Sequence, residues 1–424
     1  MLENLILLAS LATPGTSVTE KTSPPKQDAV DVQIATPRVE ELLGQARRLL
    51  AEHPGRARQL AVMAMKLEPR NTTALNLLTA SYARARAKGL DREQERFLRR
   101  QAIHDYQYFV DRRPDDAELR YRIASEQIAL GRLLPEHATA EHRALLQQAR
   151  AHLSHLIGLT SDNPAQRASA YYQRGRANKH LGDLSADPAS AHAAALKDFK
   201  QALKLDERRI DALGEIILIH RGQNNLAAAI QTARDALPRV AEKKLKAKVS
   251  AMLGNLLLEA GRPEEAVTVL RQALRDNDNL FDAHYGLSRA LMAAGDADAA
   301  YRHMLATVER HPDFADGHAL LGHIAEQRGD SAAAIRHYEN LLKIPMDGSR
   351  VIGMHPSVNL YRNQLFQDAA ARLGWYYLEK RNPQRALRAL AVARRLGPLP
   401  EFALRAEQKA RQALGTPQAT STPP

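Results

Sequence analysis

The residues best suited to metal chemistry form a short run in the first half of the chain. His137 and His142 follow Glu136 and Glu141, and imidazole and carboxylate groups are common zinc ligands. The spacing of the two histidines is not the i, i+4 spacing that places two imidazoles on one helix face, and no third ligand accompanies them. We therefore interpret this run as a solvated helix end and predict no metal site.

Motifs for catalysis are absent from the sequence. There is no glycine-rich phosphate loop, no His-Glu-x-x-His zinc motif and no Gly-x-Ser-x-Gly nucleophile turn. The chain has no cysteine, which excludes disulfides, thiolate metal sites and cysteine nucleophiles. We predict a protein that is not an enzyme and that carries no cofactor.

Composition predicts a helical core under a mixed, basic surface. Hydrophobic residues make up 44% of the 424 residues but aromatic residues only 5%, so Ala and Leu must supply most of the core. Lys and Arg outnumber Asp and Glu by 60 to 48, a charge of +12 that favours acidic partners, nucleic acid or anionic membranes. Because acidic residues are interspersed, as at Glu264 and Glu265 near Arg271, we expect a solvated mixed surface in preference to a functional basic patch.

A regular repeat organises the chain between residues 247 and 345. A small anchor residue recurs at a constant spacing, each time directly after a leucine. Each anchor is followed by glycine after seven residues, by alanine after twelve and by a large residue after sixteen. The anchors are Gly254, Ser288 and Gly322, the glycines are Gly261, Gly295 and Gly329, the alanines are Ala266, Ala300 and Ala334, and the large residues are Leu270, Met304 and Tyr338.

Each repeated position has a structural reason. The small anchor and the alanine let the two helices of a hairpin approach closely, and we expect the large residue to fill the gap against the next hairpin. Glycine seven residues after the anchor accepts the left-handed backbone that ends a helix. Proline, here Pro312, stops the second helix because the residue before it is pushed out of the helical region.

These residues resemble the signature of the tetratricopeptide repeat family. The resemblance implies an all-α, right-handed α-solenoid of about nine helix hairpins over residues 38–414, closed by a capping helix at 399–414. It also implies a non-catalytic scaffold. Looser copies of the pattern are Leu373-Gly374 with Ala386 and Leu390, Leu213-Gly214 with Gly222 and Ala228, Gly175 with Phe199 and Ala202, Ile123-Ala124 with Gly131, Leu78 and Tyr82 with Ala102 and Tyr106, and Gly44 with Ala57 and Ala61.

In the family that the chain resembles, the first helix of each hairpin lines a concave groove. The resemblance places its exposed positions one residue after each anchor and three residues before it. Aromatic residues there supply buried anchors for a peptide, and Arg and Asn supply polar contacts. Packing between neighbouring hairpins is the other interpretation of the aromatic residues. The predicted groove residues for partner binding are Tyr121, Tyr172, Arg176, Asn255, Tyr285, Arg289 and His323.

A long connection at residues 344–361 interrupts the repeats. Long loops inside compact arrays are uncommon and often functional. Two interpretations are open: a tolerated surface insertion, or a loop that folds over the groove or contacts a partner. In the second interpretation the partner-binding residues are Asp347, Arg350 and His355.

Both ends of the chain have the composition of linkers. Residues 13–37 and 415–424 are rich in Pro, Ser and Thr and bury too little apolar surface to become ordered. The apolar run Leu2–Ala12 ends like the cleavage site of a secretory signal, but it lacks a positive flank and is too short to span a bilayer. An exported, periplasmic protein and a cytoplasmic protein both stay open.

These observations predict a scaffold or adaptor that binds a protein or peptide. If residues 1–37 begin with a signal, assembly of a larger cell-envelope complex is the natural role. One alternative is a cytoplasmic regulatory protein. The other is a basic helical solenoid that associates with nucleic acid, although the regular spacing of the repeat argues against the RNA-reading helical repeats.

Overall fold

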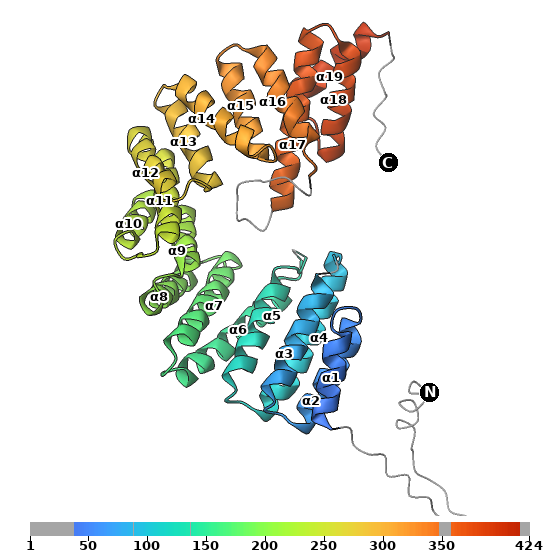
Figure 1. The fold of residues 1–424 in the computed structure, drawn as a ribbon, viewed down its shortest axis with the longest axis vertical. Coiled ribbons are helices and arrows are strands. Elements are labelled where there is room, and N and C mark those ends of the chain that lie inside the picture. Colours follow the sequence, from blue (N-terminus) through green and yellow to red (C-terminus); the bar gives the residue numbers. More distant parts are fainter. Residues whose placement is uncertain (1–37, 88, 136, 347–357, 416–424) are drawn as a thin grey trace, which may run out of the picture. The chain divides into compact units, whose positions relative to one another are not determined.

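The computed structural model describes residues 38–87, 89–135, 137–346 and 358–415. Within these ranges the chain forms nineteen α-helices and no β-strand (Figure 1), which confirms the predicted all-α class. The helices are α1 (Val39–Leu49), α2 (Pro54–Leu67), α3 (Thr72–Arg86), α4 (Arg92–Arg112), α5 (Ala117–Gly131), α6 (Thr139–Leu159), α7 (Pro164–Asp183), α8 (Ala189–Leu205), α9 (Ile210–Gly222), α10 (Leu226–Ala236), α11 (Lys243–Glu259), α12 (Pro263–Asp276), α13 (Phe281–Ala293), α14 (Ala297–Arg310), α15 (Ala315–Gln327), α16 (Ser331–Lys343), α17 (Val358–Glu379), α18 (Pro383–Leu396) and α19 (Glu401–Ala413).

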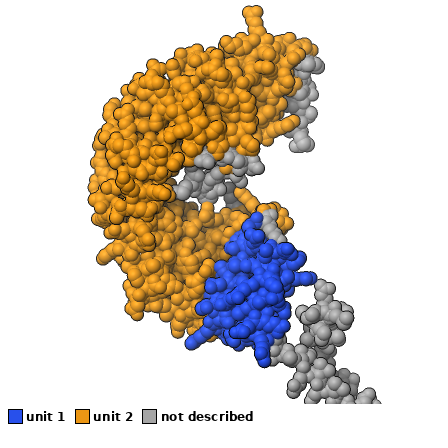
Figure 2. Space-filling view, in the orientation of Figure 1, with its two compact units in different colours: residues 1–88 blue, residues 89–424 orange. Residues whose placement is uncertain are grey.

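The chain divides into two compact units, which Figure 2 shows in separate colours. Unit 1 is Met1–Lys88 and holds α1 to α3; unit 2 is Gly89–Pro424 and holds α4 to α19. The predicted hairpin that joins Leu78 and Tyr82 to Ala102 and Tyr106 is split by this division, because α3 belongs to unit 1 and α4 to unit 2. A single solenoid over residues 38–414 therefore stays a prediction, as does the number of repeats.

Short polar residues and proline set where the helices begin. At α4, the Asp91 carboxylate accepts hydrogen bonds from the Glu93 and Gln94 backbone N–H groups, and the Gln94 side chain accepts one from the Asp91 N–H. Proline opens α2, α7, α12 and α18, where its missing N–H costs no helical bond. Further side-chain caps are Asn71, Asp116, Asn163, Asn225, Asp296, Asp330 and Asn382.

The turn inside each regular hairpin has the predicted left-handed backbone. The φ angle is 69° at Gly261, 87° at Gly295 and 72° at Gly329. In the first of these turns the Arg262 N–H donates to the Leu257 carbonyl at 2.9 Å, the bond that closes a helix end of this type. The prediction for these three glycines is confirmed.

The register predicted for α9 is wrong. The Asn225 N–H donates to the His220 carbonyl at 2.8 Å, and the left-handed residue is Asn224, with φ of 55°. Counting seven residues back from Asn224 makes Ile217 the anchor in place of Gly214. A glycine directly after a leucine looks like an anchor, but the turn bonds show which residue occupies that position.

Residue sizes are exchanged in the hairpin of α9 and α10. Ile217 is 7% exposed, and Ala233, sixteen residues later, is fully buried in the same cluster. The regular hairpins have a small anchor and a large residue at these two positions. The hairpin thus keeps the summed volume and reverses its distribution between the two helices.

Close approach at the anchors is the main packing feature of the hairpins. A Cβ atom at Gly254 would lie 2.4 Å from Leu270 Cγ, and one at Gly322 would lie 2.4 Å from Tyr338 Cε1. The large residue therefore fills the space over the anchor of its own hairpin, whereas we expected it to fill the gap against the next one. Leu270 also reaches the next hairpin, because a Cβ at Gly286 would lie 3.3 Å from its Cδ2 atom.

The odd-numbered helices of unit 2 form a layer that we call the A layer (α5, α7, α9, α11, α13, α15 and α17). Direct packing joins α5 to α7, α7 to α9, α11 to α13, α13 to α15 and α15 to α17. No two even-numbered helices pack in this way within the described residues of unit 2. Side chains from different hairpins therefore meet along the A layer from α5 to α9 and from α11 to α17.

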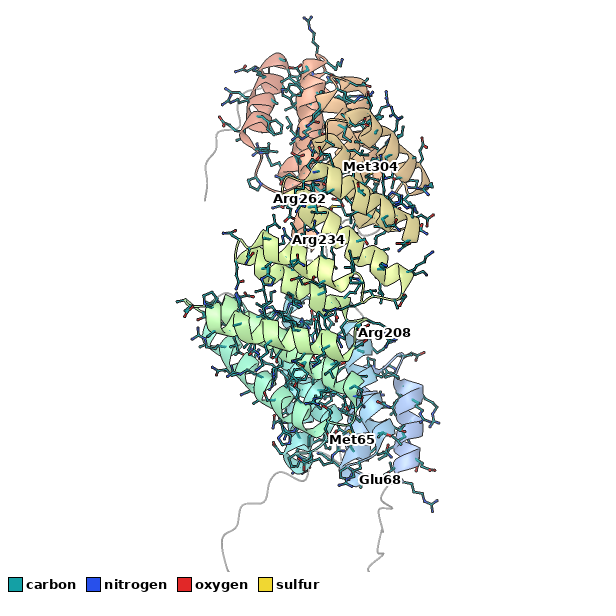
Figure 3. The ribbon with its side chains drawn as sticks, turned by 90° about the vertical axis from the view of Figure 1, so that its left-hand side faces the viewer. Met65, Glu68, Arg208, Arg234, Arg262 and Met304 are labelled. Atoms are coloured by element: carbon teal, nitrogen blue, oxygen red, sulfur yellow. The ribbon has the colours of Figure 1, made fainter. Side chains whose placement is uncertain are left out.

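The surface carries interspersed charges, as the composition suggested. Glu265 of α12 pairs with Arg234 of α10 at 3.2 Å and with Arg262, and Figure 3 marks both arginines. Such exposed pairs contribute little to stability, but they neutralise part of the basic excess. Among the described residues, no helix combines the length and the hydrophobicity that a membrane span requires.

Candidate functional site

All seven predicted groove residues lie on A-layer helices of unit 2. Tyr121 is on α5, Tyr172 and Arg176 are on α7, and Asn255 is on α11. Tyr285 and Arg289 are on α13, and His323 is on α15. Arg289 is exposed and the other six side chains are half-buried. The structure thus brings them onto one set of helices but separates them into three groups.

The first group joins α5 to α7 and contains three of the predicted residues. The Gln173 side chain donates to the Tyr121 hydroxyl at 3.4 Å and accepts from Arg176 Nη1 at 3.1 Å. The Arg176 guanidinium lies 5.9 Å from the centre of the Tyr172 ring. We call Tyr121, Tyr172, Gln173, Arg176 and Arg132 the α5–α7 cluster.

Arg132, directly after α5, adds a second cation to this cluster. Desolvation by surrounding protein atoms and then the positive charge of Arg176 lower the pKa of Arg132, while the Glu215 carboxylate acts in the opposite direction. Glu215 itself pairs with Lys179 at 3.2 Å. Neither Arg132 nor Arg176 has an ion pair with a carboxylate in the described part of the chain. Two cations that repel each other, neither of them ion-paired with a carboxylate, favour a bound anion.

A third arginine, Arg209, also lies over the Tyr172 ring. The Arg209 guanidinium lies 4.4 Å from the centre of the Tyr172 ring, bonds to Ser169 Oγ at 2.9 Å and pairs with Asp211 at 3.0 Å. Burial and then the Asp211 charge raise the pKa of the Tyr172 hydroxyl, which is therefore neutral at physiological pH. Two guanidinium groups therefore lie near the Tyr172 ring, and the nearer of them is itself fixed by Ser169 and Asp211.

The second group lies on α11 and α13. The Asn255 side chain covers Gly286, where a Cβ would lie 2.4 Å from Asn255 Oδ1. The Arg289 guanidinium lies 5.7 Å from the centre of the Tyr285 ring. Burial, and then the charge of Asp316, raise the pKa of Tyr285. Asn255 thus serves contact between hairpins, while Arg289 repeats the arrangement of Arg176 over Tyr172.

The third group is an ion network between α15 and α17. His323 lies 3.4 Å from Glu326 and 3.5 Å from Asp368, and Arg372 contacts the same carboxylates at 2.9 and 2.8 Å. Burial alone raises the pKa of Glu326, but the hydrogen bond to His323 and the charge of Arg372 outweigh it and lower that pKa. His323 is therefore engaged within the chain, which makes it less available to a partner than the other predicted residues.

Of two exposed apolar side chains on the A layer, Trp375 occupies a groove position that the resemblance predicts, one residue after the anchor Gly374, whereas Leu218 was not predicted. Leu218 of α9, one residue after the corrected anchor, is 44% exposed, and Trp375 of α17 is 39% exposed. Trp375 and Phe402 line a groove of about 320 Å³ between α17 and α19. The corrected register of α9 is the signal that would have found Leu218.

The remaining predicted residues divide between the described and the undescribed parts of the chain. Asp347, Arg350 and His355 of the long connection lie outside the described residues. His142 packs against Gly131, where a Cβ would lie 2.4 Å from its Cδ2 atom. Burial, followed by the charge of His180, lowers the pKa of His142. Within the described ranges, no three His, Asp or Glu residues gather in a metal-binding arrangement.

A family model described as tetratricopeptide repeat matches residues 257–324. This match includes the anchors Ser288 and Gly322 and the turn glycines Gly261 and Gly295. Residues 257–324 therefore form a tetratricopeptide repeat segment. Proteins built from this repeat are generally non-catalytic scaffolds for protein interactions.

Three solved structures illustrate how distant the similar proteins are. A tetratricopeptide repeat protein from Parabacteroides merdae is 15% identical over 68% of this chain and 98% of its own, with a TM-score of 0.41. Yeast Tom70 is 12% identical over 89% and 96% of the two chains, with a TM-score of 0.39. PilF of Pseudomonas aeruginosa is 17% identical over 52% and 90%, with a TM-score of 0.36. No curated protein matches the chain.

Proposed function

We propose that this tetratricopeptide repeat protein is a scaffold that binds an acidic segment of a partner protein at the α5–α7 cluster. The observation that carries the proposal is the pair of cations without an ion-paired carboxylate, Arg132 and Arg176, together with the Tyr172 ring that Arg176 and Arg209 contact. A carboxylate placed between the two arginines relieves their mutual repulsion. A flat aromatic surface next to them suits an apolar side chain of the same segment.

The site has the balance of polar and apolar groups that peptide recognition requires. The Tyr121 hydroxyl, the Gln173 amide and the two guanidinium groups offer directional hydrogen bonds, and Tyr172 offers apolar area. Because Gln173 already links Tyr121 to Arg176, these groups lose little conformational freedom on binding. Tyr285 and Arg289 offer a second, smaller contact for a longer segment.

A peptide array tests this proposal directly. Fifteen-residue peptides with two or three acidic residues around an apolar residue are compared with copies in which Asp and Glu become Asn and Gln. We expect binding that depends on the acidic residues and that falls by at least about tenfold in the Arg132→Glu/Arg176→Glu variant, because two attractive charges become repulsive.

The matched control is Arg208→Glu, since Arg208 is also an exposed arginine of unit 2 but pairs only with Asp206 in its own turn. This variant should bind like the parent, and circular dichroism should show that all variants fold. Equal binding by the parent and by Arg132→Glu/Arg176→Glu would reject the site. Preferential binding of single-stranded RNA or DNA over acidic peptides would support the nucleic-acid alternative instead.

The same proposal extends to the compartment of the protein and to the long connection at residues 344–361. We propose a role in assembling a cell-envelope complex if residues 1–37 direct export, and N-terminal sequencing of the mature protein decides this. We also propose that Asp347, Arg350 and His355 contribute to partner contact. Replacing all three with Ser should weaken peptide binding without lowering the melting temperature.

A further inference from the structure

Two pairs of histidines occur at the same places in consecutive hairpins. His284 of α13 recurs one repeat later as His318 of α15, and His303 of α14 recurs in the same way as His337 of α16. His284, His318 and His337 are at least nine-tenths buried, and His303 is half-buried. The pairs lie outside the α5–α7 cluster, and the inference does not depend on the proposed function.

In the first pair the two imidazoles are in direct contact. His284 Nε2 donates to the Asp278 carbonyl at 2.7 Å, which leaves Nδ1 as an acceptor. That Nδ1 atom lies 3.1 Å from His303 Nε2 and 3.3 Å from Thr307 Oγ1, and the rings are stacked with centres 5.1 Å apart. Two neutral imidazoles satisfy this geometry, whereas two charged ones would place N–H donors against each other.

In the second pair, fewer of the imidazole nitrogens have a hydrogen-bond partner. His318 bonds to the carbonyl of Pro312, the residue that corresponds to Asp278 in the next repeat. His337 Nε2 lies 2.9 Å from the Tyr301 hydroxyl. The Nδ1 atoms of His318 and His337 are buried and have no hydrogen-bond partner. A proton on either Nδ1 atom would create a buried, charged donor with nothing to receive it.

Charged groups around the first pair are mostly positive, whereas the second pair has one of each sign. The side chains that act on the first pair come from α12, α14 and the adjoining turns, and those that act on the second come from α16 and the turn before it. Around the first pair they are Arg271, Arg310 and His311, and the Asp278 carboxylate acts in the opposite direction. Around the second pair Arg336 lowers the pKa of His337 and Asp330 raises it. The Tyr301 hydroxyl of α14 also contacts His337.

We propose that these two pairs make helices α13 to α16 a proton-responsive segment of the stack. The segment is closely packed while the four imidazoles are neutral, and it loosens when the pairs take up protons. The four histidines connect both helices of two consecutive hairpins, so one chemical event acts on all four helices.

The direction in which stability changes with pH follows from the linkage between proton binding and folding. Burial and then neighbouring positive charge lower the pKa of His303 and of His337 to about 4, and burial also lowers the pKa of His284 and His318. The unfolded chain, with histidine pKa near 6.5, therefore binds more protons between about pH 6.5 and 4. Stability is fully present above pH 6.5 and falls as the pH decreases through that window, on the order of 100-fold in the unfolding equilibrium for each strongly shifted histidine.

Hydrogen exchange of the whole chain tests the proposal. Amide protection in α13 to α16 is measured at pH 7.5 and 5.0 and corrected for the intrinsic exchange rate. We expect a fall of at least about tenfold in these helices and little change in α17 to α19, because residues 358–415 contain no histidine. Equal changes in both segments would overturn the proposal.

Variants separate the pairs from other acid effects. In His303→Gln/His337→Gln the neutral amide cannot take up a proton, so the loss of protection at pH 5.0 should shrink by at least half. The control His104→Gln, at an exposed histidine of α4, should behave like the parent. If the double variant does not fold, NMR titration of the parent's histidines decides: four imidazoles with pKa below about 5.5 support the proposal, and titration of all four near 6.5 overturns it.

Discussion

Arg381 occupies a backbone position that glycine fills in the regular hairpins. Its φ angle is 55°, and it lies seven residues after the anchor Gly374, as Gly295 lies seven after Ser288. A side chain in this conformation places its Cβ too close to the following carbonyl oxygen. Arg381 is exposed, so its replacement removes no buried contact.

Arg381→Gly should therefore stabilise the protein by roughly 0.5–1 kcal/mol, the relief of strain less the greater freedom of glycine in the unfolded chain. Urea unfolding followed by circular dichroism measures this difference. The reverse change, Gly295→Ala, should destabilise by a similar amount. A loss of stability in Arg381→Gly would contradict the assignment of strain.

Which single residues could be predicted from the sequence depends on how local their role is. Gly261, Gly295 and Gly329 were predictable because a helix end of this type needs φ > 0 wherever it occurs. Arg132 was not, because its role arises from the charge of Arg176 on a different helix. The histidine pairs did carry a signal, the recurrence of His284 as His318 one repeat later.

At the scale of helices, the anchors control how closely two helices of a hairpin pack. Gly254→Ala places a methyl group 2.4 Å from Leu270 Cγ, and such overpacking costs roughly 1–3 kcal/mol. Leu270→Ala leaves a cavity and costs roughly 2–5 kcal/mol. In the double variant the added methyl group occupies part of that cavity.

We therefore expect the double variant Gly254→Ala/Leu270→Ala to be less destabilised than the sum of its single variants by roughly 1–2 kcal/mol. Chemical denaturation of all four proteins gives this coupling. Gly254→Ala/Leu390→Ala is the matched control, since Leu390 packs over Gly374 in another hairpin, and its two effects should add. Additivity in both pairs would show that the anchor does not set the helix spacing.

Helices were more predictable than their registers. The proline at the start of α12 and the aspartate caps of α14 and α16 predict where these helices begin. The repeat period predicts which helix pairs with each of them in a hairpin. The register of α9 failed because Gly214 imitates an anchor, whereas Asn224 makes the turn without a glycine. Size alone cannot identify an anchor when the neighbouring helix compensates, as Ala233 does for Ile217.

At the scale of the molecule, packing is dominated by neighbours in the chain. Within each unit, a helix packs mainly on helices one or two places away in the chain, as in other repeat proteins, where stability is a sum of local terms. A lesion in one hairpin should consequently remain local.

Ala61 of α2 is fully buried in unit 1, and Ala61→Asp buries a charge there. We expect amide protection to fall strongly in α1 to α3 and to stay within about twofold of the parent in α13 to α16. Hydrogen exchange with mass spectrometry resolves the two regions. A uniform loss along the chain would instead indicate one cooperative body.

The exchanged sizes at Ile217 and Ala233 constrain how a regular hairpin, with a small anchor and a large partner residue, can evolve into one with the reverse arrangement. Starting from a small anchor and a large partner, a lineage must change both positions, and neither order is neutral. Enlarging the anchor first forces two bulky side chains into one space, whereas shrinking the partner first leaves only a void. Conversion in either order is therefore expected to pass through a destabilised hairpin, unless both positions change together.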